Sequence, residues 1–278
     1  MVWVLVGGQA LFRSADRGDT WQERPLPPIT PIITDAEISF VSDREGWVAS
    51  VGDQGAPQCA QQSLRLWHSS DVGTTYDGGT PPSGLEAPQC KAGLSFLDAQ
   101  RGFIGAWAPA SSPVLYRTTD GGHTWAASRP FPDPPGFSAQ AANSVLRLGR
   151  VRAFGDTLLV AADGVTTTGG NLYVFRSTDG GASWSYAATA PIPFSLAFVT
   201  VSRWIELSAP GDSRETTDAG VTWHPFATDY RQAAPVTPSV VFGDDSVGYA
   251  TVRGGQQRTI DGGTRWTPLR TPGTYLPP

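Results

Sequence analysis

An eight-residue pattern, Ser/Thr-x-Asp-x-Gly-x-x-Trp, occurs six times in this chain of 278 residues and constrains its fold more than any other feature. The copies are SADRGDTW, SSDVGTTY, TTDGGHTW, STDGGASW, TTDAGVTW and TIDGGTRW, with their aspartates at Asp16, Asp71, Asp120, Asp179, Asp218 and Asp261. Consecutive aspartates are 55, 49, 59, 39 and 43 residues apart. A period of about 40 to 50 residues is typical of propeller blades, and no interval has room for a second blade.

The residues around each copy predict short antiparallel strands. ISFVSDREGW, LSFLDAQRGF and VVFGDDSVGY each contain a strand, a short turn, and a Gly-aromatic pair that begins another strand. A third strand, such as VLYRT, leads into the repeated turn, and a fourth follows its tryptophan. Four short strands per repeat predict an all-β fold: a single β-propeller over residues 1–278 with six four-stranded blades, or seven as the alternative.

The repeated turn resembles the Asp-box, or BNR repeat, of sialidases, xyloglucanase-type glycoside hydrolases and sortilin-like receptors. The longer cadence F-x-D…G-W…R-T-x-D-G-G-x-T-W covers nearly the whole chain and is most similar to the photosystem II assembly and stability factor family. This resemblance implies a sialidase-like propeller and, from that family, a role as an assembly scaffold. Since the box occurs on propellers of unrelated activity, it is specific for the fold and not for function.

Turn chemistry accounts for every fixed position of the box. The aspartate can accept hydrogen bonds from backbone N–H groups of the turn, and the glycine adopts a φ that other residues resist. Its apolar lids are Trp21, Trp125, Trp184, Trp223 and Trp266, with Tyr76 in the second copy. A calcium loop needs several converging oxygen ligands, whereas each box supplies one aspartate. We therefore expect structural turns, with no metal and no cofactor.

The two cysteines are Cys59 and Cys90. Their predicted loops open on the same face of a propeller, so we expect a disulfide, with two free thiols as the alternative. A disulfide would favour an extracytoplasmic compartment, periplasmic, secreted or surface-anchored. The N-terminal MVWVLVGG has the pattern of a strand rather than of a signal peptide, so we expect a domain trimmed from a longer secreted or anchored protein.

Charge and hydropathy limit the partners. The net charge is −5 and the chain has no run of Lys or Arg, so we expect neither nucleic acid nor an anionic membrane surface as a partner. No stretch approaches the roughly 18 apolar residues of a membrane span. We expect a monomer that binds a protein or carbohydrate partner.

The long connections from the last strand of one blade to the first of the next are the expected functional loops, because the Asp-box turns are short and stereotyped. Aromatic and arginine side chains in these connections are the candidate recognition surface. They are Arg24, Arg129, Phe131, Phe137, Phe194, Phe226, Tyr230 and Arg231. The alternative is that the aromatic residues pin the loops to the propeller.

Two functions of different class fit this sequence: a non-catalytic binding or assembly scaffold, and a glycoside hydrolase. A sialidase-like site would need an arginine triad, a tyrosine activated by a glutamate, and an aspartic acid. Of these, only Tyr230, between Asp229 and Arg231, hints at such chemistry, so we name no catalytic residue and favour the scaffold.

Closure of the ring is the last expectation. Only 15 residues precede Asp16 of the first box, enough for two strands of its blade before the turn but not three. We expect residues 271–278, TPGTYLPP, to supply the missing innermost strand, or that strand to have been trimmed upstream.

Overall fold

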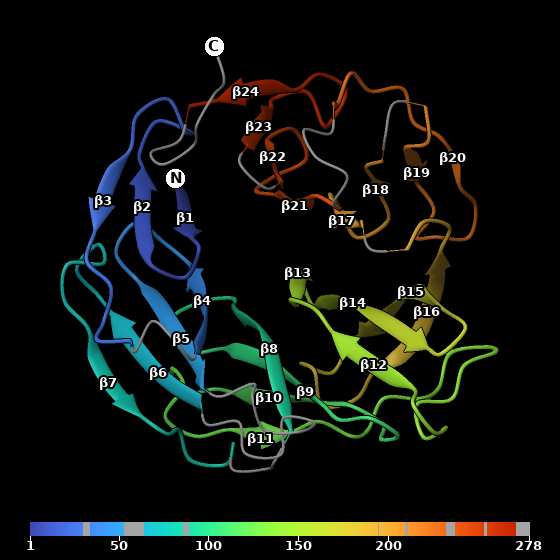
Figure 1. Cartoon of the computed structure of the whole chain (residues 1–278), viewed down its shortest axis with the longest axis horizontal. Helices are drawn as coiled ribbons and strands as arrows, with labels where there is room; N and C mark the ends of the chain where they lie inside the picture. The colour runs from blue at the N-terminus through green and yellow to red at the C-terminus, as the bar shows by residue number, and fades with distance from the viewer. Residues whose placement is uncertain are drawn as a thin grey trace.

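The computed structural model describes residues 1–29, 34–52, 64–85, 89–193, 195–208, 211–231, 237–252 and 255–270. Within these residues the chain forms six antiparallel sheets and no helix. The sheets follow one another around a ring, in chain order, as Figure 1 shows. The predicted all-β fold with six blades is confirmed, and seven blades are not needed to account for the repeats.

Each sheet is one blade, and its strands lie side by side in sequence order. Blade one holds β1 (Val2–Val6), β2 (Ala10–Ser14) and β3 (Gln22–Arg24). Blade two holds β4 (Thr34–Phe40), β5 (Gly46–Gly52), β6 (Leu64–Ser69) and β7 (Asp77–Thr80). Blade three holds β8 (Cys90–Phe96), β9 (Gly102–Trp107), β10 (Val114–Thr118) and β11 (Ala126–Ala127).

The remaining blades follow the same plan, with one addition. Blade four holds β12 (Val145–Leu148), β13 (Arg152–Phe154), β14 (Thr157–Thr166), β15 (Gly169–Ser177) and β16 (Ser185–Ala190). Blade five holds β17 (Ala197–Phe198), β18 (Trp204–Glu206), β19 (Arg214–Thr216) and β20 (His224–Pro225). Blade six holds β21 (Ser239–Phe242), β22 (Gly248–Val252), β23 (Gly255–Thr259) and β24 (Thr267–Leu269).

The Asp-box turns lie on the same side of the ring as the turns between the first and second strands. In four blades a backbone N–H of the box donates to a carbonyl of that first turn; in blade three, Gly121 donates to Gln100 over 2.9 Å. Strands alternate in direction, so the loops between second and third strands, and the connections between blades, begin from the opposite side. We call that opposite side the loop face.

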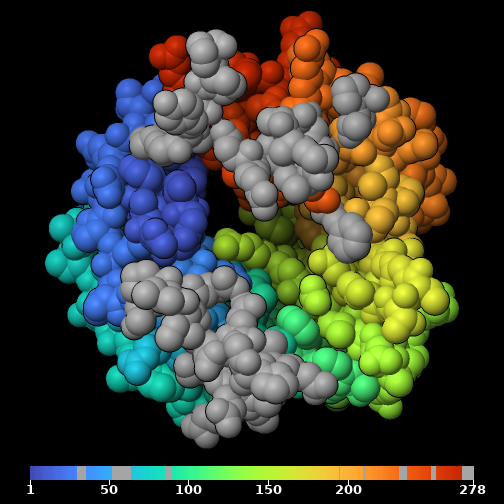
Figure 2. Space-filling view, viewed as in Figure 1, coloured from blue at the N-terminus to red at the C-terminus, as the bar shows by residue number. Residues whose placement is uncertain are grey.

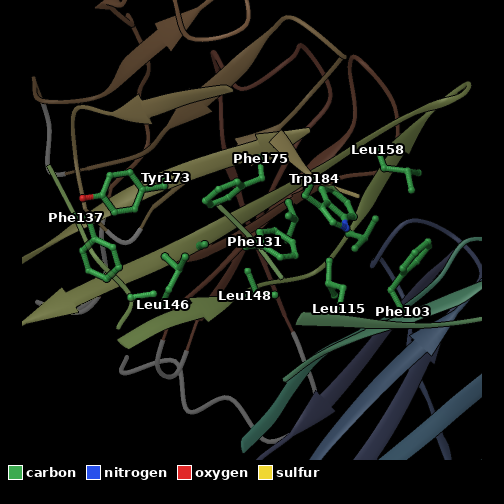
Figure 3. Packing of buried hydrophobic residues seen from close by; sticks show 14 residues of the cluster. Phe103, Leu115, Phe131, Phe137, Leu146, Leu148, Leu158, Tyr173, Phe175 and Trp184 are labelled. Carbon is green, nitrogen blue, oxygen red and sulfur yellow. The ribbon is translucent and has the colours of Figure 1, made fainter. Parts of the chain in front are cut away.

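The hydrophobic core lies between successive blades. Figure 3 shows the junction of blades three and four, where Phe131 of the connecting segment lies between Phe175 and Trp184. The Phe131 ring meets Phe175 edge-on at 5.0 Å and stacks on Trp184 at 5.4 Å. Such packing between blades, repeated around the ring, stabilises sheets that are too small to bury their own faces.

Blade six closes on blade one through side chains. The Tyr249 hydroxyl donates to the Arg17 carbonyl over 3.1 Å, and Arg258 pairs with Asp19 over 2.9 Å. A Cβ on Gly18 would lie 2.7 Å from a Leu269 methyl group, so the first box packs directly on β24. Blade one has three strands within the described residues. The expected closing segment, residues 271–278, lies outside them.

Candidate functional site

The Asp-box turn is built as its residue types predict. In blade five, Asp218 accepts hydrogen bonds from the Thr216 hydroxyl over 2.7 Å and from the Thr222 backbone N–H over 2.9 Å. The Thr222 hydroxyl donates to its second oxygen over 2.6 Å. Ala219 and Gly220 both have positive φ, 59° and 86°, as a tight hairpin turn of this type requires. The carboxylate is therefore occupied within its own turn.

Hydrogen bonds hold the box aspartates ionised. The Thr222 hydroxyl, then the Thr222 N–H and the Thr216 hydroxyl, lower the pKa of Asp218 to about 2. In the sixth box Arg265 replaces the usual Thr or Ser, so Asp261 keeps the N–H bond but has no hydroxyl donor at that position. Among the described residues, no group of three or more His, Cys, Asp or Glu side chains is placed to hold a metal.

The predicted aromatic recognition surface needs correction, because most of its members are core residues. Phe131, Phe137 and Tyr230 are 2%, 8% and 1% exposed. Tyr230 meets the box residue Trp266 of the next blade edge-on at 5.6 Å, whereas Phe131 stacks on the box residue Trp184. Each of these connecting segments thus packs an aromatic ring over the box of the next blade, because a buried ring is more stable than one exposed to solvent. The pinning alternative holds for these residues.

The remaining predicted residues are scattered. Phe226 is partly buried, with the Arg203 guanidinium 5.9 Å from its ring centre. Arg129 and Arg231 are exposed, and the Arg129 backbone N–H donates to the Ala182 carbonyl of the fourth box. Arg24 is half-buried, with one bond of 3.1 Å to Gln22, so the arginines do not gather in one place. Phe194 lies outside the described residues.

Asp229 and Tyr230, the residues that hinted at a hydrolase site, are bonded or buried within the fold. Asp229 accepts the Trp266 backbone N–H over 2.7 Å, and its own N–H donates to the Thr264 carbonyl. The Tyr230 hydroxyl is buried, and burial raises the pKa of Tyr230. A nucleophilic tyrosine needs access to substrate, which this one lacks.

Cys90, at the start of β8, is disulfide-bonded. Its expected partner, Cys59, lies outside the described residues, so the pairing of these two cysteines stays a prediction.

The ring encloses a central hollow, which Figure 2 shows in the space-filling view. Two arginines of blade four bond to distant blades: Arg150 lies just before β13 and Arg152 begins it, and β13 lies near the centre of Figure 1. Arg150 donates to the Ile38 carbonyl of blade two over 2.8 Å, and Arg152 donates to the Phe242 carbonyl of blade six. Neither of those blades is a neighbour of blade four, so both side chains cross the interior.

A carboxylate accompanies Arg150 in the hollow. Glu37 accepts the backbone N–H groups of Gly93 and Leu94 over 3.0 and 2.8 Å, beside the irregular pairing of β8 with β9. Its second oxygen is 3.7 Å from the Arg150 guanidinium. Glu37 therefore caps N–H groups that the inner strand leaves unpaired, and Arg150 balances its charge.

A second polar group lies where β9 ends and β12 begins. The Arg147 guanidinium stands 4.9 Å over the Trp107 ring, and Arg147 is paired with Asp163 in the register of β12 and β14. Burial raises the pKa of Asp163, and the charge of Arg147 opposes that shift. An aromatic ring, a guanidinium and a carboxyl group at a strand end suit recognition of a polar ligand.

Glu206 is the most deeply buried acid of the described residues. It is 0% exposed on β18, and both its oxygens lie 3.2 Å from the Ile192 backbone nitrogen. Burial raises the pKa of Glu206 to about 8, against the Ile192 hydrogen bond and the charge of Arg214. At neutral pH this acid is protonated and inaccessible to substrate.

Sequence reasoning missed this interior set because it searched the long loops. The signal was present in VLRLGRVRAF, which places Arg147, Arg150 and Arg152 within six residues of a predicted inner strand. An arginine side chain on the innermost part of a blade has nowhere to project except the hollow or the adjacent blades.

Comparison with known proteins supports the fold. No family model matches the chain. A Paenibacillus sp protein named Xyloglucanase is 29% identical over 140 residues, which cover 42% of this chain and 13% of that protein. The match therefore spans a small part of that relative's length, and its activity is not transferred by it.

Solved structures show the same architecture at low identity. Hadza microbial sialidase Hz136 matches 83% of this chain and 57% of its own with a TM-score of 0.60 and 15% identity. An α-L-arabinanase of Penicillium chrysogenum, complexed with arabinobiose, matches 88% and 83% with a TM-score of 0.58 and 12% identity. YCF48 bound to D1 peptide matches 87% and 86% with a TM-score of 0.45 and 16% identity. The chain has the fold of sialidase-like β-propellers, which the sialidase and arabinanase structures share. Among the described residues no helix is long and apolar enough to cross a membrane.

Proposed function

We propose that the protein is a non-catalytic binding module, which recognises a protein or glycan partner through the loop face and the hollow behind it. The observation that carries this proposal is that the fold itself uses both Tyr230 and Asp229. The tyrosine is 1% exposed, and the aspartate is bonded to the Trp266 backbone. The residues that most resembled a hydrolytic site thus serve the fold.

The polar groups of the hollow suit binding better than catalysis. Glu37 is held by two backbone N–H groups, and Arg150 and Arg152 are anchored to carbonyls of other blades. General acid–base hydrolysis of a glycoside needs two carboxyl groups facing one substrate, with the acid free to exchange a proton. Groups fixed in this way offer instead a rigid surface with donors in set positions.

Hydrolysis is the second candidate, on the strength of the Xyloglucanase relative and of the sialidase and arabinanase structures. Asp163 is the acid to test, because it lies beside Trp107 and Arg147 with a raised pKa. The disulfide at Cys90 supports an extracytoplasmic site of action for either candidate.

A turnover assay separates the two candidates. The full chain is incubated with aryl sialosides, aryl arabinofuranosides and xyloglucan oligosaccharides, beside the Asp163→Asn variant. We expect no product above a protein-free blank. Product formation that Asp163→Asn abolishes would establish the hydrolase instead.

A crosslinking experiment tests the binding role directly. A photoreactive amino acid replaces Thr167, an exposed residue of the loop between β14 and β15, and in a matched control it replaces Ile260 of the sixth Asp-box, which is 64% exposed. Cells of the native host are irradiated and the products are resolved by size. We expect one discrete adduct from position 167 and none from position 260. Equal labelling from both positions would refute recognition through the loop face.

A further inference from the structure

A notch opens between blades four and five, on the side of the Asp-box turns and away from the loop face. Its walls come from β14, β15 and β16 of blade four and from the first turn, β18 and the Asp-box of blade five. The residues that matter to its chemistry are Leu159, Arg176, Tyr186, Trp204, Ala219 and Val221. Val221 is 80% exposed at the rim of the notch.

The repeats show what normally fills this place. In every blade, one residue of the strand before the one that leads into the box pairs with the residue immediately before the Ser or Thr of the box, and we call this the bridging position. It is occupied by Trp3, Trp47, Phe103, Leu159, Ile205 and Tyr249 in blades one to six. Four of the six are aromatic.

Bridging residues reach the box of the next blade. The Trp47 indole N–H donates to the Gly121 carbonyl over 2.9 Å, and the Tyr249 hydroxyl donates to the Arg17 carbonyl over 3.1 Å. The acceptor in both cases is the residue before the box glycine. At these two junctions an aromatic ring that carries a donor fills the space and bonds to the carbonyl.

Blade four lacks this bridge. Leu159 has no polar atom, and the side chains nearest the box glycine Gly220 are Ala188 and Trp204. The Ala219 carbonyl is equivalent to those of Gly121 and Arg17, but like those of Val72 and Gly180 it accepts no hydrogen bond from the described part of the protein. The space that an aromatic bridge would fill remains as the notch.

The notch also contains an arginine without an acidic partner among the described residues, whereas the equivalent arginine at the junction of blades six and one has one. Arg258 of blade six pairs with Asp19 of the first box over 2.9 Å. At the equivalent positions stand Arg176 and Val221, so the arginine meets an apolar side chain. Within the described residues, the only hydrogen bond of the Arg176 side chain is to the Thr157 hydroxyl over 3.3 Å, and no acid lies within 4.0 Å of it.

Trp204 adds a second unsatisfied group. It lines the notch, it is 0% exposed, and its indole N–H is buried with no partner. A phenol hydroxyl can donate one hydrogen bond and accept another, whereas an indole can only donate. Among the side chains that fill equivalent junctions, tyrosine alone carries a hydroxyl, which can donate to the Ala219 carbonyl as that of Tyr249 does to the Arg17 carbonyl.

We propose that the notch is a docking site for a tyrosine side chain flanked by an acidic residue on a partner protein. The ring occupies the place that Tyr249 fills at the junction of blades six and one. The hydroxyl bonds to the Ala219 carbonyl, and the acidic group pairs with Arg176 as Asp19 pairs with Arg258. This surface is separate from the loop face, so it stands or falls independently of the function proposed above.

The test uses 4-hydroxyphenylacetate, which joins a phenol to a carboxylate, as the probe. The full chain, labelled with nitrogen-15, is titrated while the Trp204 indole N–H resonance is followed by NMR. We expect a saturable shift with about millimolar affinity, as suits so small a ligand. Phenylacetate, which lacks the hydroxyl, should bind about fivefold more weakly because it loses a hydrogen bond.

Two variants and a control make the result decisive. Leu159→Tyr fills the notch with a side chain of the protein itself. Val221→Asp gives Arg176 an acidic partner within the protein, and because Val221 is exposed the change should not disturb folding. Each should weaken the probe at least about tenfold, whereas Ile260→Asp, an exposed box residue of another blade, should leave it unchanged. A shift that does not saturate, or that persists in Val221→Asp, would overturn the proposal. The peptide acetyl-Asp-Tyr-Gly-amide should then outcompete acetyl-Lys-Tyr-Gly-amide, and equal competition would refute the acidic flank.

Discussion

The junctions on either side of blade four differ, although the same repeat builds both. Between blades three and four, Phe103, Phe131, Phe175 and Trp184 are all buried in one cluster. Between blades four and five, the buried aromatic rings of the described residues are those of Phe198 and Trp204, beside the open notch. The alanines of β16, such as Ala188, stand where a larger residue would cover the next box.

The difference shows that the hydrogen bonds within an Asp-box do not determine how tightly two blades pack against each other. The fourth and fifth boxes have the same internal hydrogen bonds, with hydroxyl donors at 2.5 and 2.6 Å from Asp179 and Asp218. What changes is the residue that each blade extends toward the next box. One junction can therefore loosen, and become available to a partner, while the turns that define the fold stay intact.

Removal of a pinning ring should have the largest effect. Phe131→Ala should lower the free energy of unfolding by about 3–5 kcal/mol, because a buried ring packed on Phe175 and Trp184 leaves a cavity. Urea denaturation measures the loss. Arg129→Ala, two residues away and exposed, is the control and should change stability by less than about 0.5 kcal/mol. A small effect of Phe131→Ala would return this residue to a recognition role.

Two adjacent leucines of β14 compare the junctions directly. Leu158 is 4% exposed in the cluster with blade three, and Leu159 is 1% exposed in the cluster with blade five. We expect Leu158→Ala to cost about 3–4 kcal/mol and Leu159→Ala about 2–3 kcal/mol, because atoms beside an open notch can relax into the space. The measurement is urea denaturation of both variants at one pH. Equal costs would mean that the notch does not weaken its junction.

Much of this arrangement follows from the sequence, and the limits are instructive. The spacing of Asp16 to Asp261 predicts six blades, because each box must sit on one hairpin. The burial of Phe131 and Tyr230 could not be read from their loops, since nothing local says that a connection folds back over the next box. The crossing of Arg150 to blade two depends on closure of the ring, which brings together residues 112 apart in the chain.

The pH dependence of stability tests the junction of blades four and five through Glu206, which lies on the same face of β18 as Trp204. Its pKa is about 8 in the folded chain, against an ordinary value of 4.5. Between these values the folded state keeps a proton that the unfolded chain has released, so stability falls as pH rises from 4.5 to 8. Glu206→Gln should flatten that decline in melting temperature. Glu215→Gln, which breaks the pair with Arg203, is the control and should not.

Below pH 4 the box aspartates impose the opposite slope. Their pKa values are lowered by hydrogen bonds, so their contribution is present above the unfolded value of 3.8 and is lost as pH falls through the folded values. The melting temperature should therefore decline on both sides of about pH 4–5. If Glu206→Gln moves only the acid limb, the assignment is wrong.

The smallest effect tests whether the boxes themselves differ between the two junctions. Ser183→Ala removes the hydroxyl donor to Asp179 beside blade three, and Thr222→Val removes the donor to Asp218 beside blade four. Both hydroxyls are exposed to solvent, so each loss should lower the melting temperature by only about 1–3 °C. Arg265→Thr should raise it by a similar amount, because the sixth box then gains the donor that the other five have. Differential scanning calorimetry resolves changes of this size. If Thr222→Val costs several times more than Ser183→Ala, the loose junction depends on its box after all, and the independence argued from the two sides of blade four fails.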